Sequence, residues 1–173
     1  SIHDVDLLEF LFGDSRKLSK IHALIRYISP LTKGSLEDVS IIDLEYSDGL
    51  SGNLTSIWNH ARIDERRVEI YHENGYMILD GYTGFGFNDF SFLIKRKKHK
   101  LNYEKITKDY LHDKGYTLSS LGLGPYLYEN MSFLESILLE KRPYPGLDIG
   151  LRAHQIIEAA YNSSKMKNII SFS

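Results

Sequence analysis

Residues 41–58, the stretch that decides the fold of this chain, read IIDLEYSDGLSGNLTSIW. Apolar and polar residues alternate from Ile42 to Tyr46, and a second alternation runs from Leu50 to Trp58. Between the two alternations lies the pair Asp48-Gly49, a strong signal for a tight turn between antiparallel strands. The stretch therefore predicts a β-hairpin in the middle of the chain.

Further strands are predicted after this hairpin. The segment 66–72 leads to a second turn pair, Asn74-Gly75, and continues as a strand over residues 76–80. Residues 90–94 are typical of another strand, and the basic run at 95–100 is interpreted as the solvated tip of a hairpin. Consecutive strands of this kind predict antiparallel pairing.

Before the hairpin, the chain begins with a predicted helix over residues 4–12. Its apolar residues recur at helical spacing, acids occupy its first turn, and Gly13 follows its end. Residues 17–28 fit both a helical and a strand template, so periodicity alone leaves this segment open.

The C-terminal part predicts two helices and a short strand. The first helix spans about residues 126–141, with Leu127, Met131, Leu134, Ile137 and Leu138 on one stripe. The second has Asp148 as its expected N-cap and buries Ile149, Ala153, Ile156, Ile157 and Ala160. Residues 169–172 are expected to add a strand to the sheet edge. Together the elements predict an α+β fold: an open, mainly antiparallel sheet with helices packed on one face and the other face free.

Composition narrows the class of protein. With 173 residues, 42% hydrophobic and 25% charged, the chain is typical of a single globular domain. It has no cysteine and no leader pattern, which favours the cytoplasm. A formal charge of −2 argues against a nucleic-acid binder, and no apolar stretch approaches the length of a membrane span.

The opening residues supply the main candidates for chemistry. His3 lies at a helix start, where the positive end of the helix dipole disfavours its protonated form. Asp6, one turn later, lies on nearly the same face and can orient the ring or bind a substrate hydroxyl. The alternative is a frayed terminal histidine and a surface acid. A metal site built from His3, Asp4, Asp6 and His22 lacks the ligand spacing of helical metal motifs.

Other motifs are weaker. The glycines at 81, 84 and 86, and at 122 and 124, do not match a phosphate-binding loop and are interpreted as turns. Residues 58–62 (WNHAR) follow a long strand, where polar groups can meet a polyhydroxylated ligand. A core tryptophan followed by a polar loop is the competing interpretation.

Three segments together resemble the glucose-fructose oxidoreductase and inositol dehydrogenase (Gfo/Idh/MocA) family. The opening 2–13 is similar to its H-D-x-D-L-x-x-x-L-x-G helix, and 51–58 with 67–75 to its strand, R-x-E-I-x-G segment and hairpin. Residues 133–163 carry patterns close to its F-x-x-x-I and A-A-Y-x-S ending. The resemblance covers nearly the whole chain and favours a strand for residues 17–28.

The resemblance implies a substrate-facing C-terminal domain, spanning 1–173, of an NAD- or NADP-dependent sugar or polyol oxidoreductase. His3 would be the general base, with Asp6, Asn59, His60 and Arg62 facing the substrate. A second aspartate would fall just before Ser1, and the lysine of an E-K-P motif would lie in an N-terminal Rossmann domain, so this chain would be a trimmed piece of the parent enzyme. We expect the chain alone to bind neither cofactor nor metal. Relatives associate through the free sheet face, which implies a homo-oligomer.

A second hypothesis assigns the chain to a different class of protein. A non-catalytic carbohydrate-binding or scaffolding module would keep the same sheet and lose the chemistry. The coding sequence upstream of Ser1 discriminates the two, because only an enzyme needs a G-x-G-x-x-G segment and an E-K-P motif there.

Overall fold

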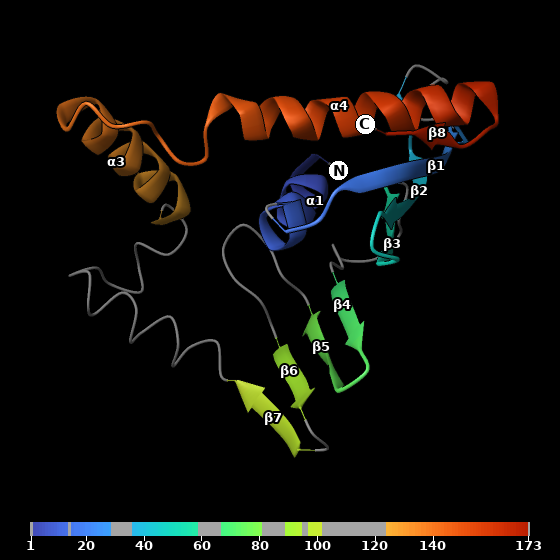
Figure 1. Cartoon of the computed structure of the whole chain (residues 1–173), viewed down its shortest axis with the longest axis horizontal. Helices are drawn as coiled ribbons and strands as arrows, with labels where there is room; N and C mark the ends of the chain where they lie inside the picture. The colour runs from blue at the N-terminus through green and yellow to red at the C-terminus, as the bar shows by residue number, and fades with distance from the viewer. Residues whose placement is uncertain are drawn as a thin grey trace. The chain divides into compact units, whose positions relative to one another are not determined.

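The computed structural model describes residues 2–13, 15–28, 36–58, 67–80, 89–94, 97–101 and 124–172. The chain divides into two compact units (Figure 1). One unit combines Ser1–Ala61 with Pro145–Ser173, and the other is Arg62–Tyr144. Each unit is described by itself below.

The first unit contains an antiparallel sheet with the strand order β3-β2-β1-β8. Its strands are β1 (Leu18–Arg26), β2 (Val39–Tyr46), β3 (Ser51–Ile57) and β8 (Ile170–Ser171). The strand favoured for residues 17–28 is confirmed as β1, and the short C-terminal strand is confirmed at the sheet edge beside β1.

The β2–β3 hairpin predicted from the sequence is confirmed. Gly49 N–H donates to the Tyr46 carbonyl at 3.0 Å, and Tyr46 N–H donates to the Leu50 carbonyl at 2.8 Å. Gly49 has φ = +90°, a conformation that L-residues with a side chain rarely adopt. The glycine therefore closes the loop and sets the register of β2 against β3.

Helices α1 (Ile2–Leu8) and α4 (Leu147–Met166) cover one face of this sheet, with α4 running along β1 (Figure 1). The predicted first helix continues past Leu8 as a wider π-helical turn, η1 (Glu9–Gly13). The core between helices and sheet consists of apolar residues from each of these elements: Val5, Leu18, Ile21, Ala23, Ile42, Leu44, Tyr46, Ala153, Ile156, Ala159 and Ala160.

The N-cap predicted for α4 is wrong. Gly146 is the N-cap, in an extended conformation, and Asp148 lies inside the first turn. A carboxylate in the first turn still interacts favourably with the helix dipole, which explains why the sequence pattern pointed to it. Ile149 and Ile157 are partly exposed, whereas Ala153, Ile156 and Ala160 are buried as predicted.

Two serines of α4 complete the hydrogen bonding of β1 beyond the end of β8. Ala23 N–H donates to Ser163 Oγ at 3.0 Å, and Ile25 N–H donates to Ser164 Oγ at 2.8 Å. Ser163 Oγ in turn donates to the Asn168 carbonyl at 2.6 Å, just past the end of the helix. Ser163 is fully buried, so it satisfies both a strand donor and a helix-end carbonyl away from water.

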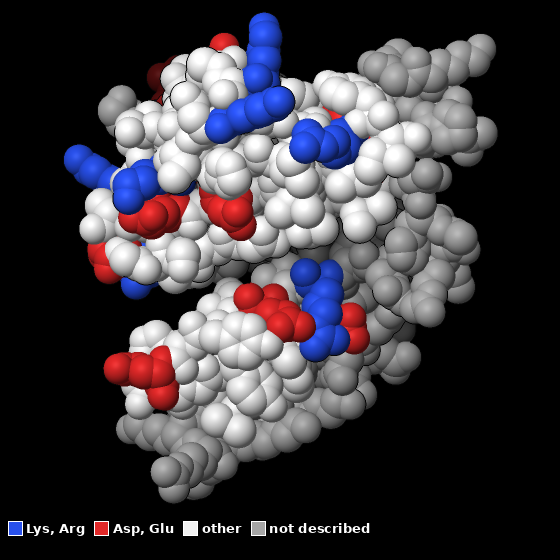
Figure 2. Space-filling model, turned by 90° about the vertical axis from the view of Figure 1, so that its right-hand side faces the viewer, with Lys and Arg blue, Asp and Glu red and all other residues white. Residues whose placement is uncertain are grey.

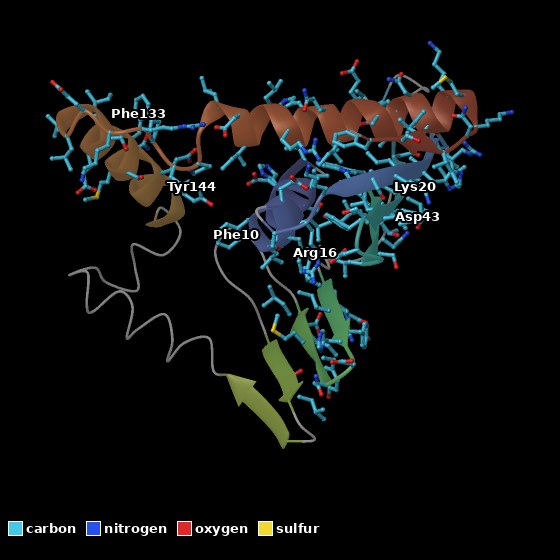
Figure 3. The ribbon with its side chains drawn as sticks, in the orientation of Figure 1. Phe10, Arg16, Lys20, Asp43, Phe133 and Tyr144 are labelled. Carbon is cyan, nitrogen blue, oxygen red and sulfur yellow. The ribbon has the colours of Figure 1, made fainter. Side chains whose placement is uncertain are left out.

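The opposite face of the sheet carries alternate residues that point away from the helices. Lys20 Nζ and Glu45 Oε1 form an ion pair at 2.8 Å, and Asn53 Nδ2 donates to Asp43 Oδ1 at 2.7 Å. Figure 3 labels Lys20 and Asp43 on these neighbouring strands. Leu24 lies on the same face and pairs across the strands with Ile41. This face is therefore part polar and part apolar.

The second unit contains the antiparallel sheet β4-β5-β6-β7. Its strands are β4 (Arg67–His72), β5 (Gly75–Asp80), β6 (Asp89–Ile94) and β7 (Lys97–Leu101). The second predicted hairpin is confirmed, but its turn residues are Glu73 and Asn74, because His72 pairs with Gly75. Residues 97–100 of the basic run lie in a strand paired with β6.

Helix α3 (Gly124–Leu138) also belongs to the second unit and ends earlier than predicted. Glu140 adopts a left-handed conformation with φ = +51°. Its N–H donates to the Ile137 carbonyl at 3.2 Å, and Lys141 N–H donates to the Ser136 carbonyl at 2.8 Å. This pattern is a Schellman motif, which stops the helix before Pro143 can. The described residues of its predicted apolar stripe, Met131, Leu134, Ile137 and Leu138, are exposed.

The predicted fold class is confirmed: the chain is α+β, with antiparallel strands and helices. The described strands pair in two sheets instead of the single sheet expected. None of the described helices is long and apolar enough to cross a membrane.

We predict that Ser163→Ala destabilises the protein by about 1–3 kcal/mol, because the buried Ala23 N–H loses its acceptor. Urea denaturation followed by circular dichroism measures the change. Ser51→Ala, at an exposed position of β3, is the matched control and should stay within about 0.5 kcal/mol of the parent. Equal stability of Ser163→Ala and the control would contradict this role of the serine.

Candidate functional site

Both candidate residues at the chain start lie on the exposed surface of α1. His3 and Asp6 are one helical turn apart and are both exposed, so the helix brings them to neighbouring positions. No hydrogen bond or ion pair joins them within the described residues. The arrangement leaves the His3 ring free to meet a ligand that approaches the N-terminal turn of the helix.

The helix that carries His3 is held against α4 and the sheet. Val5 is only 1% exposed and sits in the core. Glu9 Oε2 in the following turn lies 3.6 Å from Arg152 Nε of α4, and the Arg152 guanidinium stacks 4.1 Å above the centre of the Phe172 ring. One buried apolar contact and one ion pair therefore hold α1 and η1 in place.

The burial of this ion pair changes the pKa values of Glu9 and of the nearby Tyr46. Burial raises the pKa of Glu9, and the positive charge and hydrogen bond of Arg152 oppose that rise only in part. Burial and the nearby Glu9 carboxylate raise the pKa of Tyr46 to about 12. Phe12 packs edge-on against Tyr46, with ring centres 6.3 Å apart. These groups form a structural support below the α1 surface.

A hollow of about 430 Å³ opens beside the start of α1, within the size range of small-molecule sites. Ile2, the residue before His3, lines it. The rest of its wall comes from the end of the sheet and from α4: Ile25, Leu36, Glu37, Asp38, Val39, Ser40, Ile42, Ser56, Trp58, Ile157, Ala160 and Tyr161. The structure thus adds a concave surface to the neighbourhood of His3.

Asp38 organises the rim of this hollow. It is 2% exposed, and its two carboxylate oxygens accept hydrogen bonds from Ile28 N–H at 2.9 and 3.0 Å. Its own N–H donates to the Arg26 carbonyl at 3.1 Å, and its carbonyl accepts from Trp58 N–H at 2.8 Å. The ends of β1, β2 and β3 are therefore tied together at one residue.

The predicted polar loop after Trp58 is only partly described. Asn59, His60 and Arg62, the predicted substrate contacts, lie outside the described residues. Trp58 itself is 79% exposed at the mouth of the hollow, so it is not the core residue that one interpretation expected. Sequence reasoning also missed Glu37, Asp38 and Tyr161. The Glu37–Tyr161 contact joins residues more than 100 positions apart, which no local pattern signals.

A larger hollow, of about 520 Å³, lies on the opposite face of the sheet. Its wall includes Lys20, His22, Asp43, Glu45 and Asn53, but neither His3 nor Asp6. His22 Nδ1 lies 3.7 Å from Asp43 Oδ2, so this wall holds acids and bases together. The described residues contain no cluster of three histidine or acidic side chains suited to a metal ion.

Acidic and basic side chains are mixed over the face shown in Figure 2. Blue and red groups lie next to one another there, in keeping with a formal charge of −2. Arg16 Nε and Asp48 Oδ2 form one such ion pair in the first unit, at 2.5 Å.

Comparison with known proteins finds a family model that matches the first part of the chain. The model of the GFO/IDH/MocA C-terminal domain matches residues 1–78, which include His3, Asp6 and the β2–β3 hairpin. The predicted resemblance to the Gfo/Idh/MocA family is thereby confirmed. No curated protein sequence matches the chain significantly.

Solved structures of Gfo/Idh/MocA-type oxidoreductases share the fold of the whole chain. The WlbA dehydrogenase from Bordetella pertussis, in complex with NADH and UDP-GlcNAcA, has 16% identity and a TM-score of 0.74, with 99% of this chain and 46% of that chain covered. The myo-inositol 2-dehydrogenase from Lactobacillus plantarum has 17% identity and a TM-score of 0.69, and the match covers 100% of this chain and 47% of that chain. The aldose-aldose oxidoreductase from Caulobacter crescentus, complexed with glycerol, has 16% identity and a TM-score of 0.70, and the match covers 99% of this chain and 45% of that chain. The chain thus spans just under half the length of these structures.

We predict that the Glu9 carboxyl makes stability depend on pH. Its pKa is raised in the folded state, so its contribution is present below the ordinary value of 4.5 and is lost as the pH rises through the raised value. The free energy of unfolding of the parent should therefore fall relative to that of Glu9→Gln as the pH rises from 4.5 to neutrality. Denaturant titrations across this range measure the difference, with Glu158→Gln on the exposed side of α4 as a control for the loss of one charge. A pH-independent difference would contradict the burial of Glu9.

Proposed function

We propose that this chain is the substrate-facing C-terminal domain of an NAD- or NADP-dependent oxidoreductase that acts on a sugar or polyol. The observation that carries the proposal is His3, exposed on the first turn of α1 beside a hollow, in a segment that matches the GFO/IDH/MocA C-terminal domain. An imidazole side chain can act as a general base toward a substrate hydroxyl.

In the proposed reaction, a substrate C–H bond and the neighbouring O–H bond break together. A bound nicotinamide cofactor would supply the hydride acceptor for this carbon. His3 accepts the proton of the hydroxyl, so the alcohol carbon becomes a carbonyl and charge is conserved. Asp6, on the same helix face, binds a substrate hydroxyl or orients the His3 ring. Asn59, His60 and Arg62 are proposed to complete the substrate contacts.

The cofactor is proposed to come from a Rossmann domain on the N-terminal side of this chain. The solved structures extend to about twice the length of the matched part, since 45–49% of each is covered. That domain would also bring the lysine of the E-K-P motif and an aspartate placed before His3. The absence of cysteine supports a reducing cytoplasm as the location.

The helix-free face of the first sheet is proposed to form a homo-oligomer interface. Its apolar part includes Leu24, Ile41 and Ile57 on adjacent strands, and its polar part includes the Lys20–Glu45 ion pair. Acids and bases on one surface allow a second copy to pair with it about a two-fold axis, and the apolar residues supply surface to bury.

We predict that His3→Ala in the full-length protein lowers turnover by about 10²–10⁴-fold, because a general base is lost. Initial rates of NADH or NADPH formation with a polyol substrate measure the effect. His154→Ala, which removes another exposed histidine on α4, is the control and should leave the rate unchanged. An unchanged rate for His3→Ala would remove His3 from the mechanism.

We predict that Leu24→Glu shifts the protein toward the monomer, because a charge would be buried in the proposed interface. Sedimentation velocity measures the distribution of species. Leu147→Glu, at an exposed position of α4, introduces the same charge elsewhere and should leave the distribution unchanged. A parent protein that is monomeric at all concentrations tested would contradict the interface.

A further inference from the structure

The segment formed by α1 and η1, residues 2–13, is attached to the rest of the first unit at few points. Val5 is its one fully buried residue, and Ile2, Leu8 and Phe12 pack against the core while staying partly exposed. A helix of seven residues has little stability of its own, and a π-helical turn is rare and often marks a functional site. Individual contacts therefore decide how often this segment leaves the sheet.

Glu9, the first residue of η1, makes the charged contact of the segment. Its side chain is only 10% exposed, and its Oε2 lies 3.6 Å from Arg152 Nε, whereas a charge-assisted hydrogen bond is about 2.7–2.9 Å long. The Arg152 guanidinium also stacks 4.1 Å above the Phe172 ring, so the ring and the carboxylate share it. The result is a loose ion pair around a nearly buried carboxylate.

The main chain of η1 closes over the same carboxylate. A Cβ atom placed on Gly13 would lie 3.0 Å from Glu9 Oε2, so the glycine lets the backbone come this close. Glu9 thus has the turn on one side and Arg152 of α4 on the other. Full hydration of the carboxylate requires the turn to move.

The groups that face Glu9 do not neutralise it completely. They are Arg152 from α4, Tyr46 from β2, and Arg16 just beyond η1. Burial raises the pKa of Tyr46 to about 12, so its hydroxyl stays neutral, and Arg16 is paired with Asp48 at 2.5 Å. Burial raises the pKa of Glu9 by more than Arg152 lowers it, so the folded segment holds the Glu9 proton more tightly than water does.

We propose that Glu9 is a proton-sensitive anchor of α1, and that the segment 2–13 opens locally more often when Glu9 is ionised than when it is protonated. The ionised carboxylate gains hydration on opening, whereas the neutral carboxyl loses little by staying buried. The stabilising contribution is present below the ordinary value of 4.5 and is lost as the pH rises through the raised pKa. Because α1 carries His3, opening would displace the candidate base. That consequence rests on the proposed function, whereas the opening itself does not.

Amide hydrogen exchange of the 173-residue chain measures the opening. Protection factors, which are corrected for the intrinsic pH dependence of exchange, should be lower for residues 7–12 than for the central strand β2. They should fall as the pH rises from 4.5, by up to about tenfold per pH unit, and level off above the raised pKa of Glu9.

Two variants test the cause of the pH dependence. Glu9→Gln keeps the shape and removes the titration, so the protection of residues 7–12 should no longer change with pH. Arg152→Gln removes the cation that opposes the raised pKa of Glu9, so the fall in protection should extend to higher pH, and Arg152→Lys should reverse part of that shift. Glu158→Gln and Lys165→Gln, at exposed positions of α4, are the matched controls and should keep the parent profile. Circular dichroism checks that each variant is folded.

Three results would overturn the proposal: protection of residues 7–12 that does not change with pH in the parent, protection equal to that of β2, or a Glu9→Gln profile like that of the parent. Equal protection would mean that the segment opens only when the whole unit unfolds. These results are independent of turnover. A pH-dependent opening with no effect of His3→Ala on turnover would keep the anchor and reject the catalytic role of His3, and a loss of turnover with a flat protection profile would do the reverse.

Discussion

The structure of the first unit depends on how the edge of β1 finds hydrogen-bond partners. Strand β8 pairs with only Lys20 and Ile21, and an edge strand with unpaired donors would attract other chains. Ser163 and Ser164 of α4 accept from the next two donors, Ala23 and Ile25. The helix can lie close enough to do this because small side chains, Ala159 and Ala160, face the sheet. The edge is thereby closed by a helix where a further strand would otherwise be needed.

That contact also supports the candidate site. Because α4 is fixed on β1, its Arg152 is placed to hold Glu9, and the helix that carries His3 stays beside the sheet. The same helix contributes Tyr161 to the hollow, while Asp38 ties the strand ends that form its rim. The packing of α4 on β1 therefore also fixes the orientation of the helix that carries His3, as expected when candidate functional residues are held by well-packed elements.

The two faces of the first sheet have different chemical character. The helix-covered face holds the core, the hollow and the turn that carries His3. The helix-free face alternates ion pairs such as Lys20–Glu45 with apolar residues such as Leu24, a composition suited to a protein interface. Buried and exposed side chains alternate from Lys20 to Arg26 in β1 and from Ile42 to Tyr46 in β2, which gives the two faces their different composition.

The sequence by itself determined the elements whose signals are local. The alternation around Asp48-Gly49 specified a hairpin because strand period and turn chemistry involve neighbouring residues. The helix that contains His3 and Val5 was predictable for the same reason, since helical spacing relates residues only three or four positions apart. The strand over 17–28 needed the family resemblance, since its apolar residues fit both periods. Only the tertiary structure decided that Asp148 is not a cap, that Trp58 is exposed, and that Glu37, Asp38 and Tyr161 share one hollow. The Glu37–Tyr161 contact joins residues more than 100 positions apart, and no local pattern carries information about which distant side chain will fill a given space.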